Sequence, residues 1–208
     1  MRAKPNRLMS LFRLIRDTLR AALIISRAFS TGAVATVVFL AQLLSVVSAG
    51  NRHVHLTRNR LGVFVLLPNT PASTLLRFVA FFLGLCLPAL LAAAYRYLWS
   101  GNALVELVGF GLSACLVLWL IAGMTLMARQ GGVALDARGL PEGKLYILSA
   151  LAQFPGSNSG VLADLRTAIS TLPSGSLVAG AAANETMALR YEKLGFTRES
   201  GLQLFLQL

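Results

Sequence analysis

Few side chains in this sequence combine a reactive type with a suggestive spacing. His53 and His55 stand two residues apart, so on a strand they would point to the same face and could act as a general base or as metal ligands. No third ligand accompanies them, and the sequence therefore favours no metal site. Cys86 and Cys115 each lie inside an uncharged apolar run without zinc-type spacing, so we expect two buried, reduced thiols.

A polar, helix-like segment near the C-terminus, "NETMALRYEKLGF" at 184–196, stands out in a mostly apolar chain. Asn184 is a good residue to cap the start of a helix, and Gly195 can take the left-handed conformation that ends one. Phe196 is then expected to enter the next strand and anchor it in the core. Tyr191 lies on the helix between them, and its position alone is typical of a tyrosine at the edge of a core.

The residues around this segment alternate between strand and helix patterns. From Gly131 the composition becomes that of a small soluble domain. The predicted order is strand "KLYILSALAQF", loop "PGSNSG", helix "VLADLRTAISTL", strand "LVAGAAA", helix "NETMALRYEKLG", and a strand or small hairpin "FTRESGLQLFLQL". This alternation predicts a β-α-β crossover and an α/β layer over residues 131–208.

Residues 140–200 resemble the C-terminal half of the GNAT acetyltransferase superfamily. The resemblance lies in the order strand, Gly-bearing loop, helix, strand, and in the closing pattern Asn-x6-Tyr-x3-Gly-Phe. It implies a GNAT-like α/β fold that uses acetyl-CoA or another acyl-CoA. Tyr191 would be the general acid that protonates the departing CoA thiolate, and Asn184 would lie beside the pantetheine arm. The CoA pyrophosphate would meet the backbone N–H groups of a loop at a helix N-terminus, formed by Ser157, Asn158, Ser159 and Gly160.

The sequence also departs from the family pattern. Ser157 stands where the family's loop usually has Arg or Gln, and Leu162 stands where a Gly or Ala normally lets the phosphate approach. Met187 replaces a small residue early in the closing helix. The N-terminal half of the family's fold, which contributes contacts to the acyl acceptor, has no recognisable segment here.

Composition indicates a membrane protein. The chain has 208 residues, of which 56% are apolar, against about 45–50% in soluble domains. Mean hydropathy is +0.68, and the excess sits in long uncharged runs. One run lies between Arg27 and Arg52, and its segment 31–50 is long enough either to span a bilayer or to lie in it as a re-entrant or in-plane segment.

Two further apolar runs predict a transmembrane helix hairpin over residues 72–129. The first run, 78–95, is uncharged between Arg77 and Arg96, whose charged ends can reach the membrane interface. The second run, 107–128, is also uncharged. The fold class expected from the sequence is therefore a membrane protein with an α-helical hairpin and a C-terminal α/β domain.

The charge balance is strongly basic, with 19 Lys plus Arg against 8 Asp plus Glu. Residues 1–30 predict a basic amphipathic helix, which could lie on an anionic membrane surface or pack as an ordinary surface helix. The basic residues are not interleaved with aromatic ones, so no nucleic acid is expected as a partner. The partners expected are membrane lipid and either a membrane protein or a second copy of the chain.

Charge also predicts the topology. The link at 100–102 has no Lys or Arg, whereas the tail after Arg129 has several, which places the tail in the cytoplasm. Residues 51–70 read as a strand-like hairpin. Because the helix hairpin crosses the membrane twice, these strands share a side with the tail and can add to its sheet.

Two functions follow as expectations. The first is a membrane-anchored N-acyltransferase that moves an acetyl or longer acyl group from acyl-CoA to an amine at the cytoplasmic membrane face. The second is a non-catalytic integral membrane protein whose degenerate GNAT-like module binds CoA or serves assembly in a membrane complex.

Overall fold

The computed structural model describes residues 7–98, 103–129, 144–182 and 184–208. The predicted link at 100–102 and the beginning of the 131–208 region lie outside these residues. In chain order the elements are α1 (Arg7–Phe29), α2 (Gly32–Ala49), β1 (Val54–Leu56), β2 (Gly62–Pro68), α3 (Pro71–Leu98), α4 (Ala103–Arg129), β3 (Lys144–Gln153), α5 (Val161–Ser170), β4 (Ser176–Ala181), α6 (Glu185–Glu192), β5 (Thr197–Ser200) and β6 (Gln203–Gln207).

A mixed sheet of six strands forms the body of the protein, in the order β1-β2-β3-β4-β6-β5. Strands β3 and β4 are parallel and are joined through α5, which is the predicted β-α-β crossover. All other neighbouring strands are antiparallel. The hairpin expected within residues 51–70 is present as β1 and β2, and it joins the sheet of the tail because β2 pairs along β3.

Helices cover both faces of the sheet, as the alternation of side chains in β2 shows. Phe64 and Leu66 belong to the core under α5 and α6, whereas Val63, Val65 and Leu67 belong to a second core under α1. A strand covered on both faces is apolar at successive positions instead of at alternate ones. The apolar run of β2 therefore marks a central, fully buried strand.

Helix α1 packs on the sheet with its C-terminal half. Ala21, Ala22, Ile24 and Ile25 are at most 2% exposed and contact the apolar residues of β2 and α2. Exposed apolar side chains lie on either side of this stretch, among them Phe12 in the first half of the helix and Phe29 at its last position. Of the two interpretations that the sequence left open for this helix, packing against the rest of the protein therefore applies to residues 21–25. Helical periodicity identifies an apolar face, but it does not show whether protein or lipid covers that face.

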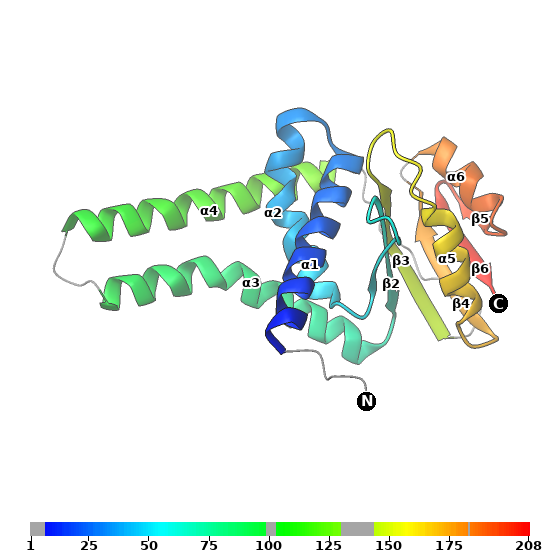
Figure 1. The fold of residues 1–208 in the computed structure, drawn as a ribbon, viewed down its shortest axis with the longest axis horizontal. Helices are drawn as coiled ribbons and strands as arrows, with labels where there is room; N and C mark the ends of the chain where they lie inside the picture. The colour runs from blue at the N-terminus through cyan, green and yellow to red at the C-terminus, as the bar shows by residue number, and fades with distance from the viewer. Residues whose placement is uncertain (1–6, 99–102, 130–143, 183) are drawn as a thin grey trace.

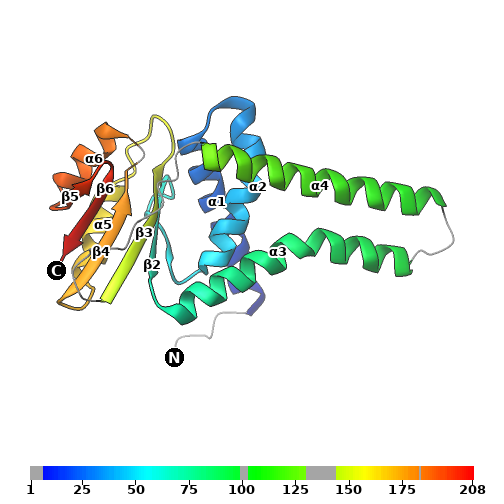
Figure 2. The same ribbon diagram turned by 180° about the vertical axis from the view of Figure 1, so that it is seen from behind.

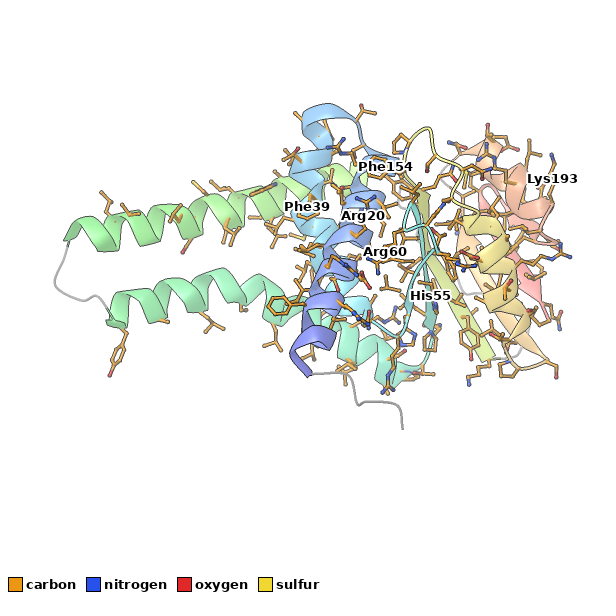
Figure 3. The ribbon with its side chains drawn as sticks, viewed as in Figure 1. Arg20, Phe39, His55, Arg60, Phe154 and Lys193 are labelled. Atoms are coloured by element: carbon orange, nitrogen blue, oxygen red, sulfur yellow. The ribbon has the colours of Figure 1, made fainter. Side chains whose placement is uncertain are left out.

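The Arg20 side chain connects α1 to the sheet. The Arg20 Nε donates a hydrogen bond to the Arg60 carbonyl oxygen (3.2 Å) in the turn between β1 and β2, and its guanidinium lies 5.5 Å from the centre of the Phe154 ring. Figure 3 shows these three residues together where α1 meets the sheet. These two contacts connect α1 to the turn between β1 and β2 and to the end of β3.

Helices α3 and α4 form a long hairpin that projects away from the sheet, while α2 runs across its base (Figures 1 and 2). Two stretches are long and apolar enough to cross a membrane, Gly32–Ala49 in α2 and Leu107–Leu126 in α4. The first is 33% buried inside the protein and the second only 11%. By length and composition, α4 is weak evidence for contact with a membrane, whereas α2 is in part a core helix.

Both cysteines lie on the hairpin, and both are exposed. The expectation of buried thiols was therefore wrong for Cys86 and Cys115. An apolar run is equally compatible with a protein core and with an exposed apolar surface, and here both thiols lie on the outside of the protein.

Candidate functional site

The central feature of the candidate site is a gap in strand pairing between β3 and β4. The two strands pair from Lys144 opposite Ser176 to Leu148 opposite Gly180, after which β3 continues to Gln153 beside β2 alone. At the same point Ser149 is an extra residue in the pairing of β3 with β2, which forms a β-bulge. In the described part of the chain, the edge of β3 from Ser149 to Gln153 that faces away from β2 therefore has no partner strand.

A groove of about 1080 Å³ follows this unpaired edge. Its volume is at the upper end of the range of roughly 300–1,000 Å³ that is usual for small-molecule sites. One end lies between α5 and α6, where the wall includes Val161, Leu162, Ala182, Asn184, Met187, Arg190 and Tyr191. The other end lies between α2 and α3, where the wall includes Gln42, Ser45, Val46, Asn69, Thr74, Arg77, Phe78 and Phe81. The groove thus joins the α/β domain to the apolar helices.

Tyr191 stands in the wall of the groove, held by the core behind it. The side chain is 5% exposed and packs on Phe196 with ring centres 5.5 Å apart. Burial raises the pKa of Tyr191 above its usual value, because the low-dielectric surroundings penalise the phenolate. The hydroxyl therefore stays protonated at neutral pH and can donate a hydrogen bond, or its proton, to a group that becomes negatively charged beside it.

The closing segment folds locally as its residue types predict. Asn184 caps α6, since its side-chain oxygen accepts a hydrogen bond from the Met187 N–H (3.0 Å). Gly195 has a φ of 96°, which only glycine adopts readily, and it turns the chain toward β5. Phe196 is 4% exposed and lies in the core. These local features fix Asn184 and Tyr191 on the same side of α6 as the groove, which both residues line.

The glycine loop at 157–160 lies beside the groove, not in its wall. Its hydrogen bonds are mostly internal: the Ser157 N–H donates to the Phe154 carbonyl (3.0 Å), and the Val161 N–H donates to the Ser159 Oγ (3.3 Å). The Asn158 carbonyl accepts a hydrogen bond from Asn59 in the turn between β1 and β2 (3.4 Å). The N–H groups of Ser157 in the loop and of Val161 at the start of α5 are therefore already satisfied by the protein.

The remaining loop residues complete this arrangement. Ser159 is buried, and its Oγ also donates to the Gln153 Oε1 (3.2 Å). Gly160 has a φ of 69° and precedes the first residue of α5. The structure therefore brings Tyr191 and Asn184 to the groove together, while the loop contributes to it only through its neighbours Pro155, Val161 and Leu162.

Of the three residues that depart from the family pattern, two line the groove. Leu162 and Met187 are half-buried, pack against the core under α5 and α6, and form part of the groove wall. They narrow the end of the groove that lies nearest to the loop.

Two arginines in the groove wall were not predicted as site residues. Arg190 precedes Tyr191 on α6, and Arg77 lies on α3 at the opposite end. Among the described residues that line the groove there is no carboxylate, so both ends carry positive charge. Sequence reasoning placed Arg77 at the membrane interface but had no signal that the fold would bring it to the same groove as Tyr191.

The two histidines lie outside this groove. His55 stacks on Phe64 with ring centres 4.8 Å apart. Burial lowers the pKa of His53 and of His55, and nearby positive charge at Arg77 lowers that of His53 further. Within the described residues no cluster of three or more His, Cys, Asp or Glu side chains is placed to hold a metal ion.

Comparison with known proteins returns no match: no family model, no curated protein and no solved structure corresponds to this chain.

Proposed function

We propose that this protein is a membrane-anchored acyltransferase that transfers an acyl group from acyl-CoA to an amine. The observation that carries the proposal is the groove along the unpaired edge of β3, with Tyr191 and Asn184 in its wall. The GNAT-like order of elements over residues 140–200 supports it, because that order leads to the same two side chains.

The unpaired strand edge is suited to the arm of CoA. Pantetheine is an extended chain with two amide groups, and an extended chain can pair with a free strand edge by main-chain hydrogen bonds. Arg190 supplies a positive charge at the α5–α6 end of the groove, where the CoA phosphates would lie. The proposed site for the CoA phosphates relies less on the glycine loop than the sequence suggested. The Ser157 and Val161 N–H groups already donate to acceptors within the protein.

The reaction requires one proton donor at the sulfur. The amine nitrogen attacks the thioester carbonyl, the new C–N bond forms, and the C–S bond breaks to release the CoA thiolate. Tyr191 donates its proton to the thiolate, and the proton lost by the attacking nitrogen passes through solvent to restore the tyrosine. The net products are an amide and CoA thiol, and no redox partner is needed. General acid catalysis of this kind contributes roughly 10²–10⁴-fold to rate.

The helix hairpin would confine the reaction to a membrane surface. Apolar side chains on α4 face outward, among them Leu107, Phe110 and Leu118, each more than 60% exposed. A helix of 27 residues is roughly 40 Å long at about 1.5 Å per residue, which exceeds the hydrocarbon thickness of about 30 Å. With the charge pattern of the chain, this supports a hairpin that spans the bilayer and a sheet on the cytoplasmic side, where acyl-CoA is available.

The proposal is tested by titrating acetyl-CoA and a long-chain acyl-CoA into the detergent-solubilised protein and by measuring release of CoA thiol with amine acceptors. We expect Tyr191→Phe to lower turnover about 100-fold while it changes acyl-CoA affinity less than about threefold. Tyr146→Phe is the matched control, because Tyr146 lies on β3 but does not line the groove. Equal turnover in wild type and Tyr191→Phe would remove the tyrosine from the mechanism.

A non-catalytic role is the second candidate, and a specific observation favours it. Leu162 narrows the groove beside the loop, and the Ser157 and Val161 N–H groups have internal partners. If the module serves assembly alone, wild type binds no acyl-CoA, and Leu162→Ala restores binding by opening the groove. Binding of acyl-CoA without release of CoA thiol would support a non-catalytic CoA-binding module, whereas binding together with turnover would contradict this alternative.

A further inference from the structure

The end of the groove between α2 and α3 is built differently from the end that holds Tyr191. Its wall combines aromatic and aliphatic side chains with one cation, and its residues come from the helices next to the proposed membrane region. The apolar members of this wall are Ile25, Phe29, Val46, Ala49, Leu67, Phe78 and Phe81. Such a wall matches a hydrocarbon chain better than it matches a nucleotide.

Arg77 is the cation at this end, and it is held in place. Its Nε donates to the Ser73 carbonyl (3.1 Å) and its Nη2 donates to the Thr74 Oγ1 (3.1 Å), which leaves further N–H groups for a ligand. The residue is half-buried beside Phe78 and Phe81 in the groove wall. A positioned guanidinium in a partly dry site, without a carboxylate in the described wall, is suited to a phosphate or a carboxylate.

The groove also has a route toward the outer surface of α3. A second hollow of about 480 Å³ shares Asn69, Thr74 and Phe78 with the groove and extends to Leu75. Leu75 and Phe78 are 64% and 60% exposed, on the side of the helix that would meet lipid. A chain held in the groove could therefore remain continuous with the bilayer.

From these features we infer that the α2–α3 end of the groove binds a membrane-borne amphiphile, with its hydrocarbon chain against Phe78 and Phe81 and its anionic group on Arg77. The inference rests on the proposed function in one respect: it names the acceptor as a membrane lipid that carries, besides its anionic group, an amine that reaches toward Tyr191. The two arginines then have separate roles, Arg190 for the CoA phosphates and Arg77 for the lipid anion.

The test uses photo-crosslinking in nanodiscs of phosphatidylcholine, a lipid without net charge. One probe is a long-chain alkyl phosphate with a diazirine in its chain, and the second is the matching alcohol with the same chain and no charge. Cross-linked residues are mapped by mass spectrometry. We expect the alkyl phosphate to label residues of the groove wall well above the outward-facing residues of α4.

Two pairs of variants separate the chain site from the anion site. Ser45→Trp fills the groove from an exposed position on α2, whereas Val47→Trp places the same side chain on an exposed position of α2 outside the groove. Arg77→Gln removes the charge in the groove, and Arg166→Gln removes an exposed charge on α5. Ser45→Trp should lower groove labelling by both probes severalfold, while Val47→Trp should not.

The decisive variant is Arg77→Gln, which should lower groove labelling by the alkyl phosphate about tenfold and leave labelling by the alcohol within about twofold. Arg166→Gln should change groove labelling by neither probe. Alkyl phosphate labelling that survives Arg77→Gln unchanged, or that is confined to the outward face of the hairpin, overturns the inference whatever Ser45→Trp does. The acyl-CoA titration on the same samples is independent, so loss of CoA binding with intact lipid labelling would count against the proposed function alone.

Discussion

At the scale of single residues, the site depends on groups whose local roles can be measured separately from catalysis. Asn184 belongs to the groove wall and also caps α6, and His53 lies near the cation that we assign to the lipid anion. A change in function at these positions must be separated from a change in the fold around them.

The cap at Asn184 should contribute measurably to stability. Asn184→Ala leaves the Met187 N–H without its side-chain partner, and we expect the free energy of unfolding to fall by about 1 kcal/mol. Denaturant unfolding followed by circular dichroism measures this change. Asn51→Ala, at an exposed turn position, is the control. An unchanged stability in Asn184→Ala would mean that α6 is held by packing alone.

The charge of Arg77 should be visible in the titration of His53. Burial is the main cause that lowers the pKa of His53, and repulsion from Arg77 is the next. Arg77→Gln should therefore raise that pKa, as followed by NMR of labelled histidine, while Arg58→Gln in the turn between β1 and β2 should have a smaller effect. No movement in Arg77→Gln would show that the guanidinium lies farther from the imidazole than the structure has it.

The lowered pKa of His53 also makes stability depend on pH. Because the folded state holds the pKa of His53 below its value in the unfolded chain, the unfolded state binds more protons as the pH falls through about 6.5. Stability should therefore decrease as the pH falls through this range. Arg77→Gln should weaken that dependence, which a series of unfolding curves between pH 5 and pH 8, a range of about three units, would detect.

At the scale of elements, close contact between α2 and α4 sets the base of the hairpin. The Trp119 Nε1 on α4 donates to the Val37 carbonyl oxygen on α2 (3.0 Å), and Gly123 lies against the same carbonyl. A Cβ added at Gly123 would lie 2.7 Å from that oxygen, whereas nothing lies within 4 Å of the corresponding position at Gly111. Gly111 and Gly123, both on α4, therefore differ sharply in whether they have room for a side chain.

We expect Gly123→Leu to push α2 away from α4 and to destabilise the protein by roughly 1–3 kcal/mol. Gly111→Leu should leave stability close to that of the wild type, because its side chain projects into open space. Thermal unfolding in detergent compares the two, and tryptophan fluorescence should change in Gly123→Leu as the Trp119 contact is lost. Equal stability of both variants would contradict the packing of α2 on α4.

At the scale of the whole molecule, the chain divides into a basic α/β body and an apolar projecting hairpin (Figure 1). The net charge of +11 suits attachment to anionic lipid. In the proposed arrangement, the groove opens where the body meets the hairpin, so one substrate would arrive from solvent and the other from the bilayer.

Membrane insertion can be tested with the native thiols. The sequence contains two cysteines, Cys86 and Cys115, and both are exposed on the hairpin. If lipid covers the hairpin, a charged maleimide should label neither thiol in intact membranes, since a charged reagent does not enter hydrocarbon. Addition of a denaturing detergent should then expose both. Rapid labelling of either thiol in intact membranes would place that part of the hairpin in water.

The orientation requires a separate measurement. A reporter that is active only in the cytoplasm, fused after Leu208, should be active according to the charge pattern. A reporter active only outside, fused at the same position, serves as the control. If the outside reporter is active and the cytoplasmic reporter is not, the sheet lies outside, where acyl-CoA is scarce. That result would count against the acyltransferase.

The sequence by itself determined the local features. Asn184, Gly195 and Phe196 act where their residue types predict, since caps, left-handed turns and the entry of a strand depend on a few neighbouring residues. The strand and helix order of the tail and the hairpin within residues 51–70 were likewise predictable from period and turn signals.

Only the tertiary structure decided what covers each apolar face and which distant residues meet. The second half of α1 packs on β2, and Cys86 and Cys115 face outward, although the periodicity and hydropathy of these segments allow either outcome. The groove arises because β3 extends beyond its pairing with β4, so that Arg77 on α3 and Tyr191 on α6 line one cavity. Strand pairing and helix docking join segments that are far apart in the chain. The free energy of these contacts depends on all the partner segments together, so it cannot be predicted from the local sequence pattern of one segment.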